Sequence, residues 1–278
     1  MLKLIRNVIC TGALAAGSWI LLSKTRTTHI KEMEQLKKHD YAHRGLHDKS
    51  LGIPENSLLA FRRAMDHGFG MELDVHLTRD GKLAVIHDAS LKRVCGADVF
   101  IEDLSLEEAR AYRLYNTDEK IPTLEEVLEL VHGAVPLIIE VKPERENEAT
   151  LCERVSELLD HYTGAFCLES FDPRAVFWFR RKRPAWVRGQ LTEYFGKHGN
   201  KDIHPALDFA LHNVLFNILT RPDFLAYNTK DRGNLTLRMC RKLFSATEAD
   251  WTIRTKEQYD IVKADGAVPI FEGFIPGK

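Results

Sequence analysis

The sequence lacks the cysteine pattern of a disulfide-stabilised or zinc-binding protein. Its five cysteines form no CxxC pair and show no regular spacing: Cys10, Cys95, Cys152, Cys167 and Cys240. Isolated cysteines of this kind usually pack in the core as small hydrophobic side chains. Four of them lie in the main part of the chain, which weakly favours a reducing compartment.

An excess of charge of one sign is also missing. The formal net charge is -1 over 278 residues, which argues against binding of nucleic acid through a general basic surface and predicts no nucleic-acid partner. No internal repeat or low-complexity tract is present. The 44% hydrophobic and 28% charged residues indicate an ordinary globular protein with one large domain. The oligomeric state does not follow from these features.

The one long hydrophobic run lies at the N-terminus. Val8 to Leu22 carries no charge and follows Lys3 and Arg6. With the apolar residues before Val8, the span reaches roughly twenty residues, enough to cross a bilayer. A cleaved signal peptide is the alternative, but no small-x-small cleavage site follows Leu22.

We therefore expect three segments: a transmembrane anchor at residues 1–23, a polar linker at 24–38 and a main domain at 39–278. More lysine and arginine residues follow the hydrophobic run than precede it. This asymmetry predicts a protein held at the cell membrane with its main domain in the cytoplasm, although short N-terminal anchors insert in either direction.

Strands alternate with helices through the rest of the chain. Nine segments have strand character, near Tyr41, Glu72, Val85, Ile138, Cys167, Gly189, Ala226, Thr252 and Val268. The alternation predicts an α/β fold with a parallel sheet and helical crossovers. We expect a (β/α)₈ TIM barrel, with an open doubly wound sheet as the alternative. A barrel has eight places, so one of the nine segments is misread or peripheral.

Two carboxylates stand in an apolar, strand-like stretch at Gly70 to Leu77. Glu72 and Asp74 are two residues apart, so both side chains point to the same face of the strand. Neighbouring carboxylates repel and are costly to bury unless a cation or a proton lies between them. A structural ion pair with an arginine is the alternative. With Glu140, these residues predict a site for Mg²⁺ or Ca²⁺, which prefer carboxylate oxygens.

The other charged residues in apolar strands also fall late in their strands. Because parallel barrel strands open at one rim, we expect His43, Arg44, His87, Glu140 and Lys142 to converge there. Imidazole titrates near neutrality, so the two histidines are candidates for general base and general acid. Arg44 and Lys142 are candidates for binding phosphate. Together with a metal ion, these groups suggest phosphoryl transfer. His76 is a further candidate to touch substrate.

Five ordered motifs carry a family resemblance: Ala42-His43-Arg44-Gly45, Pro54-Glu55-Asn56-Ser57, Glu72-Leu73-Asp74-Val75, Val85-Ile86-His87-Asp88 and Glu140-Val141-Lys142-Pro143. In this order and spacing, over roughly Tyr41 to Gly266, the chain resembles the glycerophosphodiester phosphodiesterase family. The resemblance implies a TIM barrel and a divalent cation held by Glu72, Asp74 and Glu140.

The resemblance also implies roles for other residues. His43 and His87 would form the acid/base pair, Arg44 and Lys142 would bind phosphate, Glu55 would belong to the same polar network, and Trp251 would line the substrate pocket. The implied products are glycerol 3-phosphate and an alcohol. A phosphodiesterase acting on lysophospholipid or sphingolipid headgroups, and a membrane-anchored module that binds phosphodiesters without turnover, are the alternatives.

The chain departs from the family at its C-terminal end. Asp265 to Glu272 differs from the family's usual Gly-Ile-Ile-Thr-Asp ending, so the sequence does not predict what the last strand contributes to the rim. The irregular stretch from Cys95 to Ile121 lies where family members carry an insertion that shapes substrate binding. We expect specificity for the alcohol to reside there.

Overall fold

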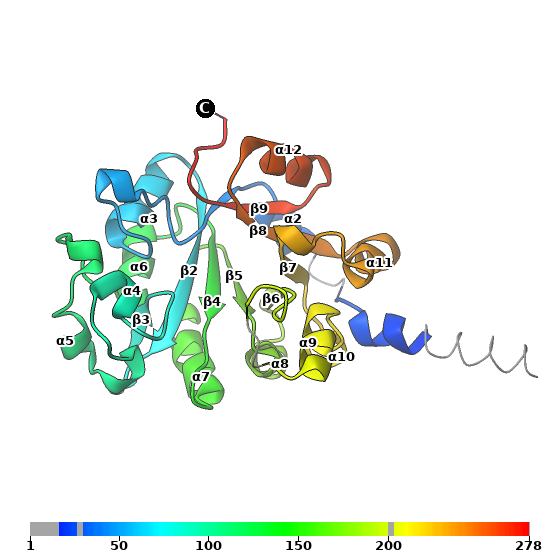
Figure 1. Cartoon of the computed structure of the whole chain (residues 1–278), viewed down its shortest axis with the longest axis horizontal. Helices are drawn as coiled ribbons and strands as arrows, with labels where there is room; N and C mark the ends of the chain where they lie inside the picture. The colour runs from blue at the N-terminus through cyan, green and yellow to red at the C-terminus, as the bar shows by residue number, and fades with distance from the viewer. Residues whose placement is uncertain (1–16, 27–29, 200–202, 278) are drawn as a thin grey trace, which may run out of the picture.

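The computed structural model describes residues 17–26, 30–199 and 203–277. Within them, eight parallel strands close into a barrel (Figure 1). The barrel strands are β1 (Tyr41–Ala42), β2 (Gly70–Leu77), β4 (Leu137–Val141), β5 (Phe166–Ser170), β6 (Arg188–Thr192), β7 (Phe224–Asn228), β8 (Thr247–Ile253) and β9 (Val268–Phe271). Pairing of β1 with both β9 and β2 completes the ring. The TIM barrel is therefore confirmed, and the open sheet is wrong.

The ninth predicted strand lies outside the barrel. It is β3 (Leu83–Val85), which pairs antiparallel with the end of β2 through a hairpin, with Val75 opposite Val85. The last strand, whose contribution the sequence left open, is β9, and it pairs with β8 as well as with β1.

The alternation of side chains along β2 decides which residues face inward. Leu73 and Val75 are completely buried in the layer between the strands and the outer helices, together with Phe61, Val127 and Leu151. Glu72 and Asp74 must then point to the opposite face, the barrel interior. The acidic pair is thus held by the hydrophobic packing of its strand neighbours.

Helices follow the strands and cover the outside of the barrel (Figure 1). They are α3 (Leu58–Asp66), α6 (Leu124–Val131), α7 (Glu148–Leu159), α8 (Pro173–Lys182), α9 (Pro205–His212), α10 (Asn217–Thr220), α11 (Leu235–Phe244) and α12 (Lys256–Ala264). An insertion after β3 adds the short helices α4 (Lys92–Cys95) and α5 (Leu106–Ala109). In the described part of the chain, four 3₁₀ turns occupy Lys49–Leu51, Ile101–Asp103, Leu114–Asn116 and Thr229–Asp231.

A helix before the first strand closes the barrel at the end where the strands begin. This helix, α2 (Ile30–Leu36), buries Met33 and Leu36 against residues at the starts of the strands, among them Phe224. The hydroxyl of Tyr41 donates a hydrogen bond to the carbonyl of Leu36 at 3.1 Å. Part of the segment expected as a polar linker therefore packs as core of the barrel.

Residues 17–26 lie along α9, α10 and α11. The stretch 17–23 is helical, and Trp19 packs edge-on against Phe209 with ring centroids 5.3 Å apart. Arg26 donates two hydrogen bonds of 2.7 Å to the carboxylate of Asp223. Among the described residues, no helix is both long enough and apolar enough to span a bilayer. Residues 1–16 of the predicted anchor lie outside the described residues, so the anchor stays a prediction.

Candidate active site

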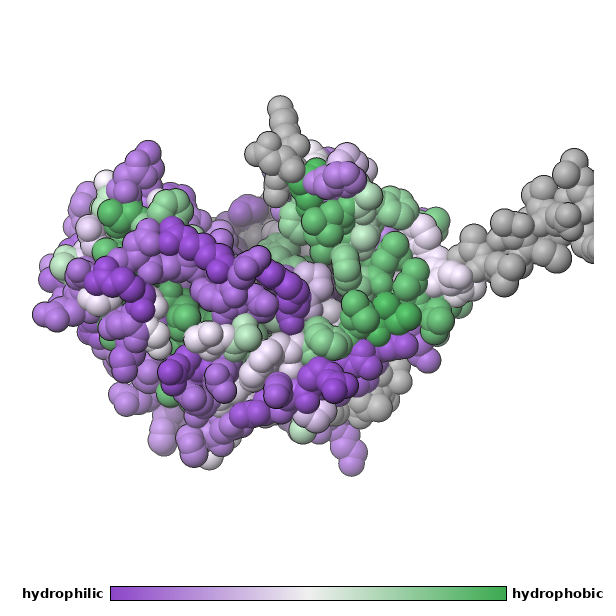
Figure 2. All heavy atoms as spheres, turned by 90° about the horizontal axis from the view of Figure 1, so that it is seen from below, coloured by the Kyte–Doolittle hydropathy of each residue, from purple (hydrophilic) through white to green (hydrophobic). Residues whose placement is uncertain are grey.

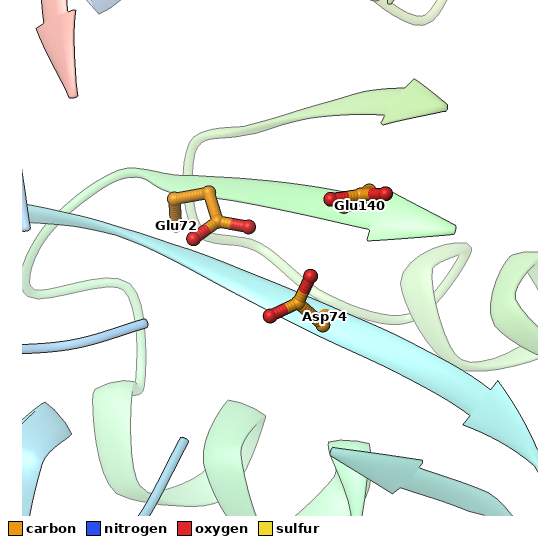
Figure 3. Close-up of side chains that lie close together, drawn as sticks. All are labelled: Glu72, Asp74 and Glu140. Atoms are coloured by element: carbon orange, nitrogen blue, oxygen red, sulfur yellow. The ribbon is translucent and has the colours of Figure 1, made fainter. Parts of the chain in front are cut away.

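Three buried carboxylates meet inside the barrel. Asp74 on β2 lies opposite Glu140 on β4 in the strand register, and Glu72 is two residues earlier on β2. One oxygen of each carboxylate lies within 4.8 Å of the others, and Figure 3 shows the three groups pointing toward a common space. Their exposed fractions are 2%, 0% and 6% for Glu72, Asp74 and Glu140. The structure thus brings together the three predicted metal ligands.

The electrostatics of this cluster indicate a cation site. Burial raises the pKa of Glu72 well above its usual range, and the charges of Asp74 and Glu140 raise it further. Burial also raises the pKa of Glu140. For Asp74, burial acts in the same direction, but the charges of Lys142 and other nearby groups outweigh it and lower the pKa. A divalent cation would relieve the cost of burying these charges, so the cluster fits one.

The two predicted phosphate-binding residues lie beside this cluster. The ammonium of Lys142 donates to Asp74 Oδ1 at 3.1 Å and to Glu140 Oε1 at 2.9 Å. The guanidinium of Arg44 donates to Glu55 Oε1 at 2.8 Å, and its backbone N–H donates to Glu72 Oε2 at 2.9 Å. Both cations are therefore held next to the acidic cluster by hydrogen bonds.

A tight turn after β1 aims the backbone of Arg44 at the acidic cluster. Arg44 has a φ of 55° and Gly45 a φ of 78°, both in the left-handed region. A Cβ at Gly45 would lie 2.9 Å from the Cβ of Ala60, so only glycine fits between the turn and α3. The sequence His43-Arg44-Gly45 thus has a structural reason for its glycine.

His43 is held by a carboxylate that the sequence did not predict. Its Nδ1 lies 2.6 Å from Glu272 Oε2, directly after β9, and its Nε2 lies 3.9 Å from Glu72 Oε2. Burial lowers the pKa of His43 to about 4, more than the hydrogen bond with Glu272 raises it. The imidazole is thus neutral near pH 7. Nδ1 carries the proton donated to Glu272, and Nε2 is left with a lone pair.

His87 reaches the pocket by a route that differs from the expected one. It follows the antiparallel strand β3, and the N–H of Ile86 donates to the carbonyl of Asp74 at 3.0 Å. The expectation that His87 ends a parallel strand is therefore wrong, because the hairpin folds the chain back toward the level of Asp74. His87 Nδ1 pairs with Asp88 Oδ1 at 2.6 Å.

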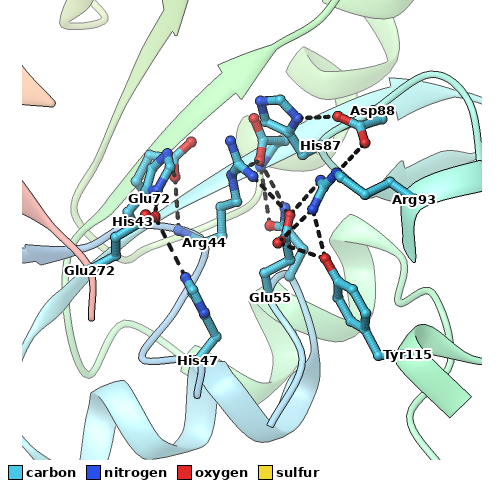
Figure 4. A network of polar contacts seen from close by, with 12 residues as sticks. His43, Arg44, His47, Glu55, Glu72, His87, Asp88, Arg93, Tyr115 and Glu272 are labelled. Carbon is cyan, nitrogen blue, oxygen red and sulfur yellow. Dashed lines mark hydrogen bonds and ion pairs between the residues drawn. The ribbon is translucent and has the colours of Figure 1, made fainter. Parts of the chain in front are cut away.

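The insertion after β3 supplies a further part of the site (Figure 4). Glu55 accepts hydrogen bonds from Arg44, from Arg93 at 2.8 and 2.9 Å, and from the hydroxyl of Tyr115 at 3.0 Å. Burial raises the pKa of Glu55, but the two arginines outweigh it and lower the pKa to about 2. Glu55 therefore belongs to the predicted polar network, whereas Arg93 and Tyr115 were not predicted.

Asn56 and His76 lie near the acidic cluster without lining the pocket. Asn56 donates from Nδ2 to Asp74 Oδ2 at 2.8 Å, while the neighbouring Ser57 caps α3. His76 is completely buried, and its Nε2 lies 3.1 Å from the carbonyl of His87. It supports the backbone of His87 and does not line the pocket described next.

The histidines, Arg44 and Glu140 line one pocket of about 710 Å³. Trp251 lines the same pocket, as predicted, and its indole N–H has no hydrogen-bond partner among the described residues. Phe171 forms another wall, edge-on to Trp251 at 5.5 Å between ring centroids. The pocket therefore combines one carboxylate of the acidic cluster, Glu140, with hydrogen-bonding cations and aromatic walls.

Residues 43–234 match the model of the glycerophosphoryl diester phosphodiesterase family. The chain belongs to this family. The matched range starts at His43 and includes the three carboxylates, both histidines, Arg44 and Lys142. Family membership and the buried carboxylates together indicate a divalent metal site.

Relatives within the family agree with this assignment. The chain is 43% identical over 109 residues to a glycerophosphodiester phosphodiesterase of Caldanaerobacter subterraneus, covering 36% of this chain and 44% of the relative. It is 33% identical over 164 residues to a lysophospholipase D of Rattus norvegicus, covering 54% of this chain and 50% of the relative. The matches thus span about half the length of these relatives.

Solved structures share the fold. The glycerophosphodiester phosphodiesterase of Thermotoga maritima is 28% identical, with a TM-score of 0.63, covering 84% of this chain and 94% of that one. A phosphodiesterase of Oleispira antarctica, solved with sn-glycerol 3-phosphate, has a TM-score of 0.68 at 22% identity, covering 84% and 92%. The second similarity shows the fold alone.

Proposed function

We propose that this chain hydrolyses glycerophosphodiesters to glycerol 3-phosphate and a free alcohol. The observation that carries the proposal is a cluster of three buried carboxylates beside one pocket, which Glu140 of that cluster lines together with two histidines and Arg44, in a member of this family. Each group has a chemistry that phosphodiester hydrolysis needs: charge neutralisation, proton removal and proton donation.

Glu72, Asp74 and Glu140 would hold Mg²⁺ or Ca²⁺, whose oxygen-ligand preference matches three carboxylates. When bound, the ion would supply positive charge next to the phosphate oxygens. Arg44 and Lys142 would add to that charge. Both are already fixed by carboxylates, so their positions cost little to organise when the phosphate arrives.

His43 is the proposed general base, because its Nδ1 proton is tied to Glu272 and its Nε2 can accept a proton from the nucleophile. His87, oriented by Asp88, is the proposed general acid for the leaving alkoxide. Glu272 and Asp88 act through the histidines as positioning residues. Trp251, which lines the same pocket, would lie against the substrate.

We further propose that the hydrophobic run within residues 1–23 anchors the protein in the cell membrane with the barrel in the cytoplasm, although its last part, at 17–23, lies against α9 in this structure. The uncharged run from Val8 to Leu22 and the basic residues that follow it support this assignment. Resistance of the full chain to alkaline extraction from membranes is the expected result. Release into the supernatant would contradict the anchor, and digestion of the barrel by protease added to intact spheroplasts would contradict the cytoplasmic face.

The activity is tested by measuring glycerol 3-phosphate release from glycerophosphocholine by the full chain. We expect release by the wild type and a loss of at least about 100-fold in His43→Ala, because general base catalysis contributes roughly that factor. The matched control is His161→Ala, at an exposed position. Wild-type binding of the substrate without product would instead indicate a binding module, and full activity of His43→Ala would refute the proposed base.

A further inference from the structure

A pocket lined by basic side chains lies at the end of the barrel where the strands begin. Its volume is about 370 Å³, and it shares no lining residue with the catalytic pocket. It is bounded by the last turn of α8, the start of β6, the end of α10 and the segment that follows the N-terminal helix. All but one of its lining residues are polar: Lys24, Thr25, Arg26, Arg180, Arg188 and Arg221. We call it the basic pocket.

One of these arginines is buried without a carboxylate at its guanidinium. Arg188 is the first residue of β6, and only 2% of it is exposed. Its guanidinium donates hydrogen bonds to backbone carbonyls, among them those of Thr220 at 3.2 Å and Arg221 at 3.0 Å. Carbonyl groups satisfy the N–H donors but carry no net negative charge. Burying a charge in this way is costly unless an opposite charge accompanies it.

The charges around the basic pocket are not balanced. Within the described ranges, Asp223 is the one carboxylate that forms an ion pair with a lining residue, and Arg26 donates to both of its oxygens at 2.7 Å. Burial and the charge of Arg26 lower the pKa of Arg188 to about 10, and the charge of Arg180 acts in the same direction. Three further cationic side chains of the pocket form no ion pair with a described residue: Lys24, Arg180 and Arg221.

The hydroxyl of Thr25 points to the same pocket independently of the charges. Thr25 lines the basic pocket and is 1% exposed. Its Oγ1 is buried and has no hydrogen-bond partner in the part of the chain that the structure describes. Buried hydroxyl groups in folded proteins nearly always have a partner, because burial removes the water that would otherwise provide one. The pocket thus holds a donor that is available to a ligand.

We propose that the basic pocket binds the phosphate group of a phosphomonoester or of inorganic phosphate. Guanidinium groups present planar sets of N–H donors that match phosphate oxygens, and the hydroxyl of Thr25 adds a neutral donor. A phosphomonoester carries up to two negative charges, which suits a pocket with an excess of positive charge. The inference goes beyond the proposed hydrolysis and does not depend on it.

The surface next to the basic pocket bears on the source of the phosphate group. Leu219 on α10 lies two residues before Arg221 and is 51% exposed. In Figure 2, hydrophobic residues gather on the half of the lower face that holds α9 and α10 in Figure 1. Free phosphate would use the charged groups alone, whereas an acidic lipid would also place its apolar part against this surface.

The test measures binding of inorganic phosphate to the full chain by calorimetry, in non-ionic detergent and EDTA. The parent protein carries Arg44→Gln, because Arg44 in the catalytic pocket is itself expected to bind phosphate. We expect one phosphate per chain. Arg221→Gln and Thr25→Val should each weaken binding by about tenfold or more, because each loses a hydrogen bond to a charged ligand. Arg238→Gln, at an exposed position on α11, is the matched control and should bind as the parent does.

Thr25→Val separates binding from folding. Since Oγ1 has no partner in the described chain, this variant should be at least as stable as its parent in urea without phosphate. Added phosphate should raise the unfolding free energy of the parent and of Arg238→Gln more than that of Thr25→Val. Absence of phosphate binding by the parent, or equal binding by Thr25→Val, Arg221→Gln and Arg238→Gln, would overturn the inference.

Two soluble short-chain lipids distinguish the sources of the phosphate group. Dihexanoyl phosphatidic acid carries a phosphomonoester, and dihexanoyl phosphatidylcholine carries a phosphodiester with a compensating positive charge; both are used below their micelle concentrations. Tighter binding of the phosphatidic acid than of inorganic phosphate supports a lipid headgroup in the basic pocket, and equal or weaker binding supports a free phosphate. Equal binding of the two lipids would overturn the inference, because the charge of the phosphate would then not decide binding.

Discussion

Replacing Glu55 by glutamine tests the polar network that holds Arg44 in the catalytic pocket. The carboxylate accepts hydrogen bonds from Arg44, Arg93 and Tyr115, and only 7% of the residue is exposed. In Glu55→Gln, the charge that compensates two guanidinium groups is lost. Because Arg44 is itself largely buried, its charge cannot be fully solvated in response.

The size of the effect follows from the pKa of Glu55, which the arginines lower from 4.5 to about 2 despite burial. A difference of this size corresponds to about 3 kcal/mol of unfolding free energy at neutral pH. The side chain of Arg93 is 40% exposed, so solvent screens part of its contribution. We therefore expect Glu55 to contribute about 2 kcal/mol.

Because the pKa of Glu55 is lowered in the folded protein, the free energy of unfolding should depend on pH in a distinct way. A carboxyl whose folded pKa is depressed stabilises the protein above its unfolded pKa, and this stabilisation is lost as the pH falls through the folded pKa. The wild type should thus lose the contribution of Glu55 between about pH 4.5 and pH 2. The glutamine of Glu55→Gln does not titrate in this pH range. The variant should therefore be less stable than the wild type at pH 7, and its unfolding free energy should fall less on acidification.

Urea denaturation at several pH values measures the contribution of Glu55 to the unfolding free energy and the dependence of that contribution on pH. EDTA is present so that no metal ion contributes. The difference in unfolding free energy between wild type and Glu55→Gln should be about 2 kcal/mol at pH 7 and shrink toward pH 3. The exposed Glu129→Gln serves as the control and should follow the wild type. A difference that stays constant with pH would refute the reasoning, because the arginines would then not be lowering the pKa of Glu55.

Two further substitutions test other parts of the structure. Glu272→Gln should lower kcat/KM for glycerophosphocholine by about 10- to 100-fold, because an amide can favour the wrong tautomer of His43; Glu257→Gln, at an exposed position, is the control, and an equal effect of both would contradict the role. Met33→Ala should destabilise the barrel by about 2 to 3 kcal/mol in urea denaturation, because Met33 is 6% exposed in the core below the strands. The exposed Glu34→Ala on the same helix should change stability by less than about 0.5 kcal/mol, and a similarly small effect of Met33→Ala would show that α2 does not close the barrel.

The features that follow local rules could be predicted from the sequence. Alternation along a strand placed Glu72 and Asp74 on one face, and the register of two parallel strands brought Glu140 next to them. The alternation of strands and helices likewise predicted the barrel. In each case the information lies within one strand or in the spacing between neighbouring elements.

Features that depend on distant parts of the chain could not be predicted. Glu272 contacts His43 only because β9 pairs with β1, and the two residues are 229 positions apart. Arg93 and Tyr115 reach Glu55 from the irregular insertion, where no periodic pattern indicates which side chains point inward. The one available signal for Glu272 was a charged residue directly after an apolar strand.

The central claim, that the three carboxylates hold the cation on which hydrolysis depends, is tested most directly by returning metal to the EDTA-treated full chain. We predict one high-affinity Mg²⁺ or Ca²⁺ per chain by calorimetry, and glycerol 3-phosphate release that returns with the same occupancy. Asp74→Asn should lose both, whereas Asp98→Asn, at an exposed position, should keep both. Full activity in EDTA, or unchanged ion binding by Asp74→Asn, would contradict the account.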